Sequence, residues 1–434
     1  MIPVSLFHLG HSGPAGRDST RSIAYEAGAE VVIDPGLEAR STCGWTGSAR
    51  TTRVTSCTPP QIRAGRLCRG ETAVVAPLPW DVRVRRVGFR FGSDAELAGL
   101  HAVESEVEAE RRPDRVPQPL DSYVAFARNL PSQFEDHTWL ADTVDGTPVA
   151  SAACWSNAAG DPRVMECDLL VRRHRRRRGI GAHLMGLISS EAESEGRTVL
   201  VWSTFDAVPA GEALARRLGG RVARVNRTSE LQVADVEWAM VASWVRDGPR
   251  RAPGYRLEMA DGPFPAELRA DAATLHHIMQ TAPREDLDVG DVTLDVSHIV
   301  ELDRALVEAG RQRWTVLVRD PTGACVGGSE VTFEPWEPTT VLQQNTGIEP
   351  SHRGLGLAKW AKAAMLERIR REQPQVHRVR TGNAFSNAPM LAINNALGFK
   401  VISTITEWQE DVAEVRHALD DPPAQLAGAS SDGA

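Results

Sequence analysis

The sequence has few cysteines, lysines and tyrosines, and it has no long apolar run. Its six cysteines form no Cys-x-x-Cys pair and no Cys/His spacing typical of a metal site, which favours reduced thiols over metal ligands or disulfides. No segment approaches the roughly 20 apolar residues that cross a bilayer. The N-terminus also lacks the basic and apolar regions of a secretory signal, so we expect a cytoplasmic protein with no membrane partner and no bound metal.

The balance of charge argues against nucleic acid as a partner. The formal net charge is −8, so the molecule as a whole is not built to bind a polyanion. Residues 172–178 form an arginine-rich run, but no aromatic residues are interleaved with it. This run is either a solvated basic face or a binding site for the phosphate groups of a smaller ligand, and we expect no nucleic-acid partner.

The length of 434 residues predicts two or three domains. Residues 40–69 are rich in Ser, Thr, Gly and Arg and have neither helical nor strand periodicity, so we expect little structure there. Ser93 and Glu96 form a capping box that opens a predicted helix, Asp94–Glu110, and the Pro/Gly/Arg segment 247–254 has the composition of a linker. The predicted division is a poorly ordered extension at 1–83, a first domain at 84–248, a linker at 249–254, a second domain at 255–412 and a flexible tail at 413–434.

One motif occurs twice at a separation of about one domain length. The copies are Val171–Gly181 and Ile348–Ala358. Each has a β-branched residue, an arginine five positions later, a glycine three further on, and a small residue two after that. A Leu-Gly element recurs nearly in step, at 218–220 and 397–399. Two features that recur together indicate a duplicated domain.

The flanks of both copies predict a strand, a glycine turn and a helix. Apolar residues alternate before the first copy, and an apolar stripe with helical spacing follows each copy. Glycines let the main chain approach a ligand closely, and the free N–H groups and dipole of the following helix attract an anion. The motif therefore predicts a cradle for a pyrophosphate, although a glycine-rich helix start that only turns the chain is the alternative. Neither copy fits a dinucleotide-binding or P-loop pattern.

The pattern Arg-x-x-Gly-x-Gly/Ala between a strand and a helix resembles the pyrophosphate-binding motif of the GNAT acetyltransferase superfamily. Over about residues 84–412 the chain resembles tandem two-domain actinobacterial acetyltransferases. The mycothiol synthases share this layout, but no residue in this sequence points to their substrate. The resemblance implies an α/β fold of two tandem GNAT domains. Each would have a mixed, mostly antiparallel central sheet, a splayed strand pair and flanking helices.

The resemblance also implies acetyl-CoA, or another short acyl-CoA, as the co-substrate, and it implies which residues bind it. In the first domain these are Leu169, Val171, Arg173, Arg176, Arg177, Arg178, Gly179, Ile180 and Gly181. In the second domain they are Thr346, Ile348, Arg353, Gly354, Leu355, Gly356, Leu357, Ala358, Asn383 and Asn387.

The family often uses a carboxylate on the splayed strand as the general base. Glu166 and Asp168 occupy such positions in the first domain, whereas the equivalent residues of the second are Gln343 and Asn345, which cannot take a proton at neutral pH. For the second domain we expect Glu330, on the preceding strand, to act as the base. Each carboxylate has the alternative of a solvated or purely structural role.

The tyrosine that many family members use as the general acid is absent from both domains. Its expected positions hold Ala215 and Asn394. Because the second domain matches the family more completely around 383–399, we expect it to be the catalytic one.

The expected function is direct transfer of an acetyl group to the amine of a small molecule by a monomer or homodimer. Acidic clusters at 104–110 and 285–303 hint at a cationic amine, although charged helix faces usually meet solvent. A non-catalytic acyl-CoA-binding regulator and a protein or peptide N-acetyltransferase are the alternatives.

Overall fold

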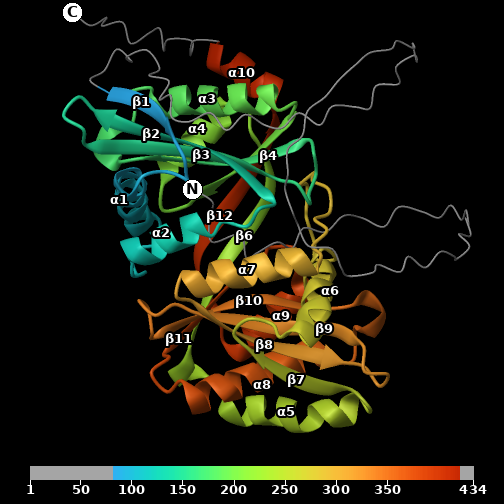
Figure 1. The fold of residues 1–434 in the computed structure, drawn as a ribbon. Coiled ribbons are helices and arrows are strands. Elements are labelled where there is room, and N and C mark those ends of the chain that lie inside the picture. The colour runs from blue at the N-terminus through green and yellow to red at the C-terminus, as the bar shows by residue number, and fades with distance from the viewer. Residues whose placement is uncertain (1–81, 421–434) are drawn as a thin grey trace, which may run out of the picture. The chain divides into compact units, whose positions relative to one another are not determined.

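The computed structural model describes residues 82–420 (Figure 1). The predicted N-terminal extension, 1–83, therefore lies almost wholly outside the described residues, as does the tail beyond Asp420. The three cysteines within the described range, Cys154, Cys167 and Cys325, are free thiols. No helix in this range is long and apolar enough to cross a membrane.

Two consecutive stretches of the chain have the same order of elements. The first, called here the N-terminal half, consists of β1 (Val82–Val87), α1 (Asp94–Arg111), α2 (Leu120–Arg128), β2 (Phe134–Thr143), β3 (Pro148–Asn157), β4 (Val164–Val171), α3 (Ile180–Ser194), β5 (Val199–Phe205), α4 (Pro209–Arg217) and β6 (Arg221–Gln232). Helix α5 (Trp238–Arg251) follows. The C-terminal half consists of β7 (Arg256–Asp261), α6 (Arg269–Met279), α7 (Val296–Glu308), β8 (Gln312–Arg319), β9 (Cys325–Phe333), β10 (Thr340–Ile348), α8 (Leu357–Glu372), β11 (Arg378–Ala384), α9 (Ala388–Leu397) and β12 (Lys400–Asp411), with α10 (Val412–Asp420) after it. The repeated motif is thus part of a repeated fold.

All the described strands belong to one sheet, in the order β1-β2-β3-β4-β5-β12-β6-β11-β10-β9-β8-β7. Neighbouring strands are antiparallel, except for the parallel pairs β4–β5 and β10–β11. A mixed, mostly antiparallel sheet with flanking helices is the fold class predicted from the sequence, and it is confirmed.

The last strand of each half is exchanged into the sheet of the other half. Strand β12 pairs with β5 of the N-terminal half, from Ile405 opposite Phe205 to Asp411 opposite Val199. Strand β6 pairs with β11 of the C-terminal half, and β6 and β12 also pair with each other. In Figure 1 the red strand β12 accordingly lies among the green strands of the N-terminal half. Boundaries drawn along the chain at 248 and 255 therefore do not divide the sheet.

Each parallel pair splays apart beyond its first few residues. Strand β4 pairs with β5 only over 164–167, after which β4 continues along β3 and β5 continues along β12. Strand β10 pairs with β11 only over 340–343, where its pairing with β9 also shifts register. Both halves therefore contain the opened strand pair that the family resemblance implied.

The local signals read from the sequence explain the helices that flank the splayed strands. The capping box predicted at the start of α1 is present: Ser93 Oγ accepts from the Glu96 N–H, and the Glu96 carboxylate accepts from the Ser93 N–H at 2.8 Å. The predicted apolar stripes after the two turns become the buried faces of α3 and α8. These faces anchor the start of each helix against the sheet, directly after the glycine turn.

Two expected irregular segments contain helix instead. Residues 249–251 of the expected linker are the last turn of α5, which includes Pro249, and Gly248 on this helix packs against the Trp360 ring of α8. Residues 413–420, expected to begin the flexible tail, belong to α10, where Val412 and Val415 are buried in the same core as α3. Packing of these few side chains outweighs the helix-breaking composition on which the expectations were based.

Candidate active site

The two copies of the motif fold into the same turn between a strand and a helix. Gly179 and Gly356 both have left-handed backbone conformations, with φ of 83° and 79°, and each directly precedes a helix. Two positions earlier, Gly354 and Arg177 are also left-handed, with φ of 84° and 62°. A side chain at positive φ is strained, so the glycines in the pattern are required by this turn, and Arg177 is the position where the first copy deviates.

The arginine of each motif holds its turn closed. Arg176 Nε donates to the carbonyl of Val171 at 2.9 Å, and Arg353 Nε donates to the carbonyl of Ile348 at 2.8 Å. The guanidinium of Arg176 also forms a bidentate pair with Glu110, at 2.8 and 2.6 Å. These bonds explain the five-residue spacing seen in the sequence.

The main chain of both turns fits the pyrophosphate of acetyl-CoA. Within the described part of the chain, the N–H groups of 180–182 and 357–359, in the first turns of α3 and α8, have no acceptor. Together with the helix dipole they form an anion cradle, and the side chains of Arg173, Arg177 and Arg178 are exposed beside the first one. The other predicted cofactor-binding residues of these segments lie in the splayed ends of β4 and β10, in the turns, or in the first turns of α3 and α8. Their contacts with a ligand remain a prediction.

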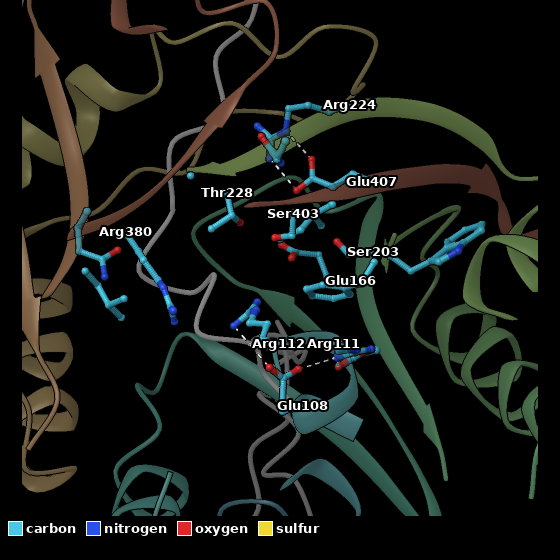
Figure 2. Close-up of a pocket in the computed structure, with 18 of the residues that line it drawn as sticks. Glu108, Arg111, Arg112, Glu166, Ser203, Arg224, Thr228, Arg380, Ser403 and Glu407 are labelled. Atoms are coloured by element: carbon cyan, nitrogen blue, oxygen red, sulfur yellow. Dashed lines mark hydrogen bonds and ion pairs between the residues drawn. The ribbon is translucent and has the colours of Figure 1, made fainter. Parts of the chain in front are cut away.

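A cavity of about 640 Å³ lies where the two splayed pairs face each other, and both halves line it (Figure 2). Its volume is that of a site for a small molecule. The residues that it receives from the splayed strands are Glu166, Cys167, Asp168, Val201, Trp202, Ser203 and Phe205 from the N-terminal half, and Leu342, Gln343, Gln344, Asn345, Arg380, Thr381, Gly382, Asn383 and Ala384 from the C-terminal half.

Glu166 is the carboxylate best suited to accept a proton in this cavity. Burial, together with the neighbouring Glu407 carboxylate, raises the pKa of Glu166 to about 7, while Arg224 opposes the shift. Arg224 and Glu407 form a bidentate ion pair, in which Arg224 Nη2 lies 2.8 Å from Glu407 Oε1. Glu166 lies at the point where β4 leaves β5, and Figure 2 shows it beside Ser203 and below this ion pair. A pKa near neutral pH suits a general base, because part of the residue is then deprotonated and still basic enough to take a proton.

Asp168, the second predicted carboxylate, is engaged by an arginine. Its two oxygens pair with the Arg111 guanidinium at 3.0 and 3.4 Å, and one of them accepts from the Leu169 N–H at 2.9 Å. Burial disfavours the ionised form, but the charge and hydrogen bonds of Arg111, together with the hydrogen bond from the Leu169 N–H, outweigh burial and keep the pKa of Asp168 below its ordinary value. This arrangement favours a structural ion pair over a proton acceptor.

Glu330, the base expected in the second domain, lies away from the large cavity. It is buried on β9, where its Oε2 accepts from Asn345 Nδ2 at 3.3 Å and its Oε1 is 3.6 Å from Arg313 Nε. It lines a separate void of about 20 Å³ with His276. The splayed pair of the C-terminal half instead presents the amides of Gln343 and Asn345 to the large cavity, as their sequence positions predicted.

A buried lysine supports the amides of the second site. Lys362 Nζ donates to Asn394 Oδ1 at 2.8 Å, and Asn394 Nδ2 donates to Asn383 Oδ1 at 2.7 Å. Burial lowers the pKa of Lys362 to about 7. Asn383 lines the cavity, so the residue in place of the usual tyrosine fixes the orientation of a cavity amide. Asn387 lines the cavity as well, and its side chain accepts from the Met390 N–H at 3.4 Å and thereby caps α9.

Neither of the tyrosines in the described range occupies the position expected for the general acid. Tyr123 lines the cavity, but burial and the adjacent Glu104 carboxylate raise the pKa of its hydroxyl well above the ordinary value. The Tyr255 hydroxyl is hydrogen-bonded to His352 Nδ1 at 2.7 Å, next to the second turn. Ala215 is buried in the core.

The charged groups beside Glu166 carry no local sequence signal. Glu407 is far along the chain and reaches the first site only because β12 is exchanged into the N-terminal half. Arg224 lies on β6, the other exchanged strand. No local motif marks either residue, and only the pairing of β5, β12 and β6 brings them together.

Comparisons with known proteins agree with this architecture. Residues 102–219 match the family model described as the acetyltransferase (GNAT) family. A tandem GNAT protein from the clavulanic acid biosynthesis pathway, solved without acetyl-CoA, is 23% identical, with a TM-score of 0.62 over 76% of this chain and 98% of that one. A GCN5-related N-acetyltransferase from Sphaerobacter thermophilus is 14% identical, with a TM-score of 0.53 over 77% of this chain and 97% of that one. A search of curated proteins found no match.

The family model covers the strand, turn and helix of the first motif, the splayed pair and Glu166, and the solved structures share the fold of both halves. Residues 102–219 match the model of the GNAT acetyltransferase family, and residues 82–420 share the fold of a tandem GNAT protein.

Proposed function

We propose that the protein is an acetyl-CoA-dependent N-acetyltransferase that modifies the amine of a small molecule in its N-terminal half. The observation that carries the proposal is Glu166, a cavity carboxylate with a pKa of about 7 at the opening of a splayed strand pair. A base with this pKa is matched to deprotonating an amine near neutral pH. A cavity of about 640 Å³ has the size of a small-molecule site, which favours a small acceptor over a protein chain.

The residues present divide into a binding part and a reacting part. The main-chain N–H groups of 180–182 would hold the pyrophosphate, and the free edges of the splayed strands would hold the pantetheine arm so that it ends at the cavity. Acetyl-CoA supplies an acetyl group activated as a thioester. The chain therefore needs only to orient the two reactants and to accept a proton.

Glu166 performs the proton transfer. Its carboxylate takes a proton from the acceptor nitrogen as this nitrogen bonds to the acetyl carbon and the carbon–sulfur bond breaks. Glu166 then gives the proton to the departing sulfur or to water, which returns the carboxylate to its starting state. The hydroxyl-bearing residue Ser203 lines the same cavity.

We assign the C-terminal half a supporting role, the reverse of what the sequence favoured. It retains the turn and the cradle, but its cavity-facing side chains at the splay are amides, and Glu330 lies in a separate void. In this proposal it binds an acyl-CoA without transferring the acyl group, and it completes the wall of the acceptor cavity.

The test is release of coenzyme A thiol with a panel of amines, measured for the intact chain and for two carboxylate variants. Glu166→Gln removes the base and should lower kcat/KM by about 10²- to 10⁴-fold, with acetyl-CoA binding by calorimetry unchanged. The wild-type kcat/KM should rise with pH through a midpoint near 7, and this limb should be absent in the variant.

Glu330→Gln is the matched control, because it removes the alternative base without changing shape. It should leave the pH limb in place. Loss of activity in Glu330→Gln with Glu166→Gln active would move catalysis to the C-terminal half. Acetyl-CoA binding without thiol release on any amine would instead support a regulator.

A further inference from the structure

The cavity contains one arginine whose hydrogen-bonding capacity is unused. Six arginines line the cavity: Arg111, Arg112, Arg115, Arg224, Arg311 and Arg380. Five of them bind carboxylates at hydrogen-bonding distance. Among the residues that the structure describes, Arg112 finds no hydrogen-bond acceptor, and its one ion-pair partner is Glu108 at 3.5 Å.

The surroundings of Arg112 leave its positive charge poorly compensated. Glu108 is shared with Arg111, which approaches it more closely, at 3.1 Å. Burial, and then the like charges of Arg115 and Arg111, outweigh Glu108 and lower the pKa of Arg112 below its ordinary value. The guanidinium lies 5.1 Å from the Phe205 ring of β5, which fixes its position against the cavity wall. A guanidinium held in place with free donors is suited to bind a planar anion with two oxygens.

Arg112 faces the same space as the proposed base. Its neighbour Arg111 is joined to Asp168, two residues beyond Glu166 on the same face of β4. Phe205, against which Arg112 lies, is two residues beyond Ser203 on the same face of β5. Figure 2 shows the Arg112 side chain directed from α1 toward the region of Glu166. One acceptor molecule in the cavity can therefore contact both groups.

We propose, on the basis of the proposed function, that the acceptor is an amino carboxylate whose carboxylate binds Arg112 while its amine faces Glu166. The phosphates of acetyl-CoA do not fill this role, because their cradle lies at the turn, at the far end of the splayed strands. The acidic face of α1 does not contradict the proposal. Burial raises the pKa of Glu104 to about 8, so this carboxyl is neutral at pH 7, and Glu108 is occupied by two arginines.

The experiment compares each amino carboxylate with its own uncharged counterpart. The panel contains amino carboxylates from glycine to 6-aminohexanoate and glycyl dipeptides, and each is paired with its own primary amide. Diamines and amino sugars are included as cationic alternatives. Thiol release gives kcat/KM, and calorimetry gives binding without turnover. Arg112→Gln should lower kcat/KM and affinity for the carboxylates by about 10- to 100-fold and leave the amides unchanged. Arg112→Lys should retain part of the preference, and Arg250→Gln, an exposed arginine on α5, should retain all of it.

The outcomes separate this proposal from the proposed function. In one outcome, turnover depends on Glu166 but is equal for carboxylates and their amides; in another, diamines or amino sugars are preferred whether or not Arg112 is present. Either outcome would overturn the amino-carboxylate assignment without contradicting the proposed acetyltransferase function. If no amine supports thiol release, the proposed function fails. Calorimetry then decides the assignment by itself, because carboxylate binding lost in Arg112→Gln supports it, and equal binding of acids and amides overturns it.

Discussion

Glu166 and Gln343 show how equivalent positions of a duplicated site can differ in their chemistry. Both lie on the strand before the turn, both face the same cavity, and both precede turns of the same conformation. Glu166 can change its charge near pH 7, whereas the Gln343 amide cannot change its charge and donates to the Glu330 carbonyl at 2.6 Å. In the proposed function, the difference in proton-accepting chemistry between the two halves therefore comes from these side chains, on strands that both precede a glycine turn.

Lys362 gives a prediction about stability at the same scale. Burial lowers its pKa from 10.5 to about 7 in the folded protein. Between these two values the unfolded chain binds a proton at this residue and the native protein does not. The contribution of this group to the free energy of unfolding therefore increases as pH rises, by up to about 1.4 kcal/mol per pH unit.

Lys362→Met should remove this dependence, so its free energy of unfolding should rise less between pH 7 and pH 10 than that of the wild type. Urea unfolding at intervals of one pH unit measures it. Lys400→Met serves as the control, because Lys400 is exposed and should leave the pH dependence unchanged. Parallel pH profiles for the wild type and Lys362→Met would contradict the assignment of a neutral buried lysine.

At the scale of elements, the strand–turn–helix unit depends on backbone conformations that only glycine adopts without strain. Gly356→Ala places a side chain at φ of 79°, with open space around it, so the cost is in the backbone and amounts to about 1 to 2 kcal/mol. The strain also shifts the N–H groups at the start of α8, so binding of acetyl-CoA to the C-terminal half should weaken.

Gly310→Ala is the matched control, because Gly310 has a φ of 75°, equally open surroundings and a position after α7, away from both turns. Thermal unfolding should show a similar loss of stability for the two variants. Calorimetry should show weaker acetyl-CoA binding for Gly356→Ala alone. Equal acetyl-CoA affinity in both variants would mean that this turn does not bind the co-substrate.

At the scale of the whole molecule, the strand exchange makes the two halves dependent on each other. Without β12, strand β5 is left as an open edge, and Glu166 loses the Arg224–Glu407 pair beside it. Chains covering 82–254 and 255–420 should each fail to unfold cooperatively when purified alone, as judged by circular dichroism and denaturant titration. Mixed during refolding, they should form a stable complex. Independent cooperative folding of either half would show that the exchanged strands contribute little to stability.

Local sequence rules were sufficient to predict the duplication, the two glycine turns, the helices that follow them and the fold class. These follow from local rules, because positive φ demands glycine, apolar residues at helical spacing bury one face, and Ser93 with Glu96 caps α1. The sequence also placed Glu166 on the strand before the first turn, but it could not rank this residue above Asp168 or Glu330.

The reasons to propose Glu166 as the base come from neighbours that are distant along the chain. Arg111 pairs with Asp168, Glu330 lines a separate void, and burial, together with the Glu407 carboxylate, raises the pKa of Glu166. The exchange of β6 and β12 and the cavity shared by the two halves likewise could not be predicted from the sequence. They arise from pairing between strands in different halves, and no periodicity or motif in a single sequence encodes which strands will pair.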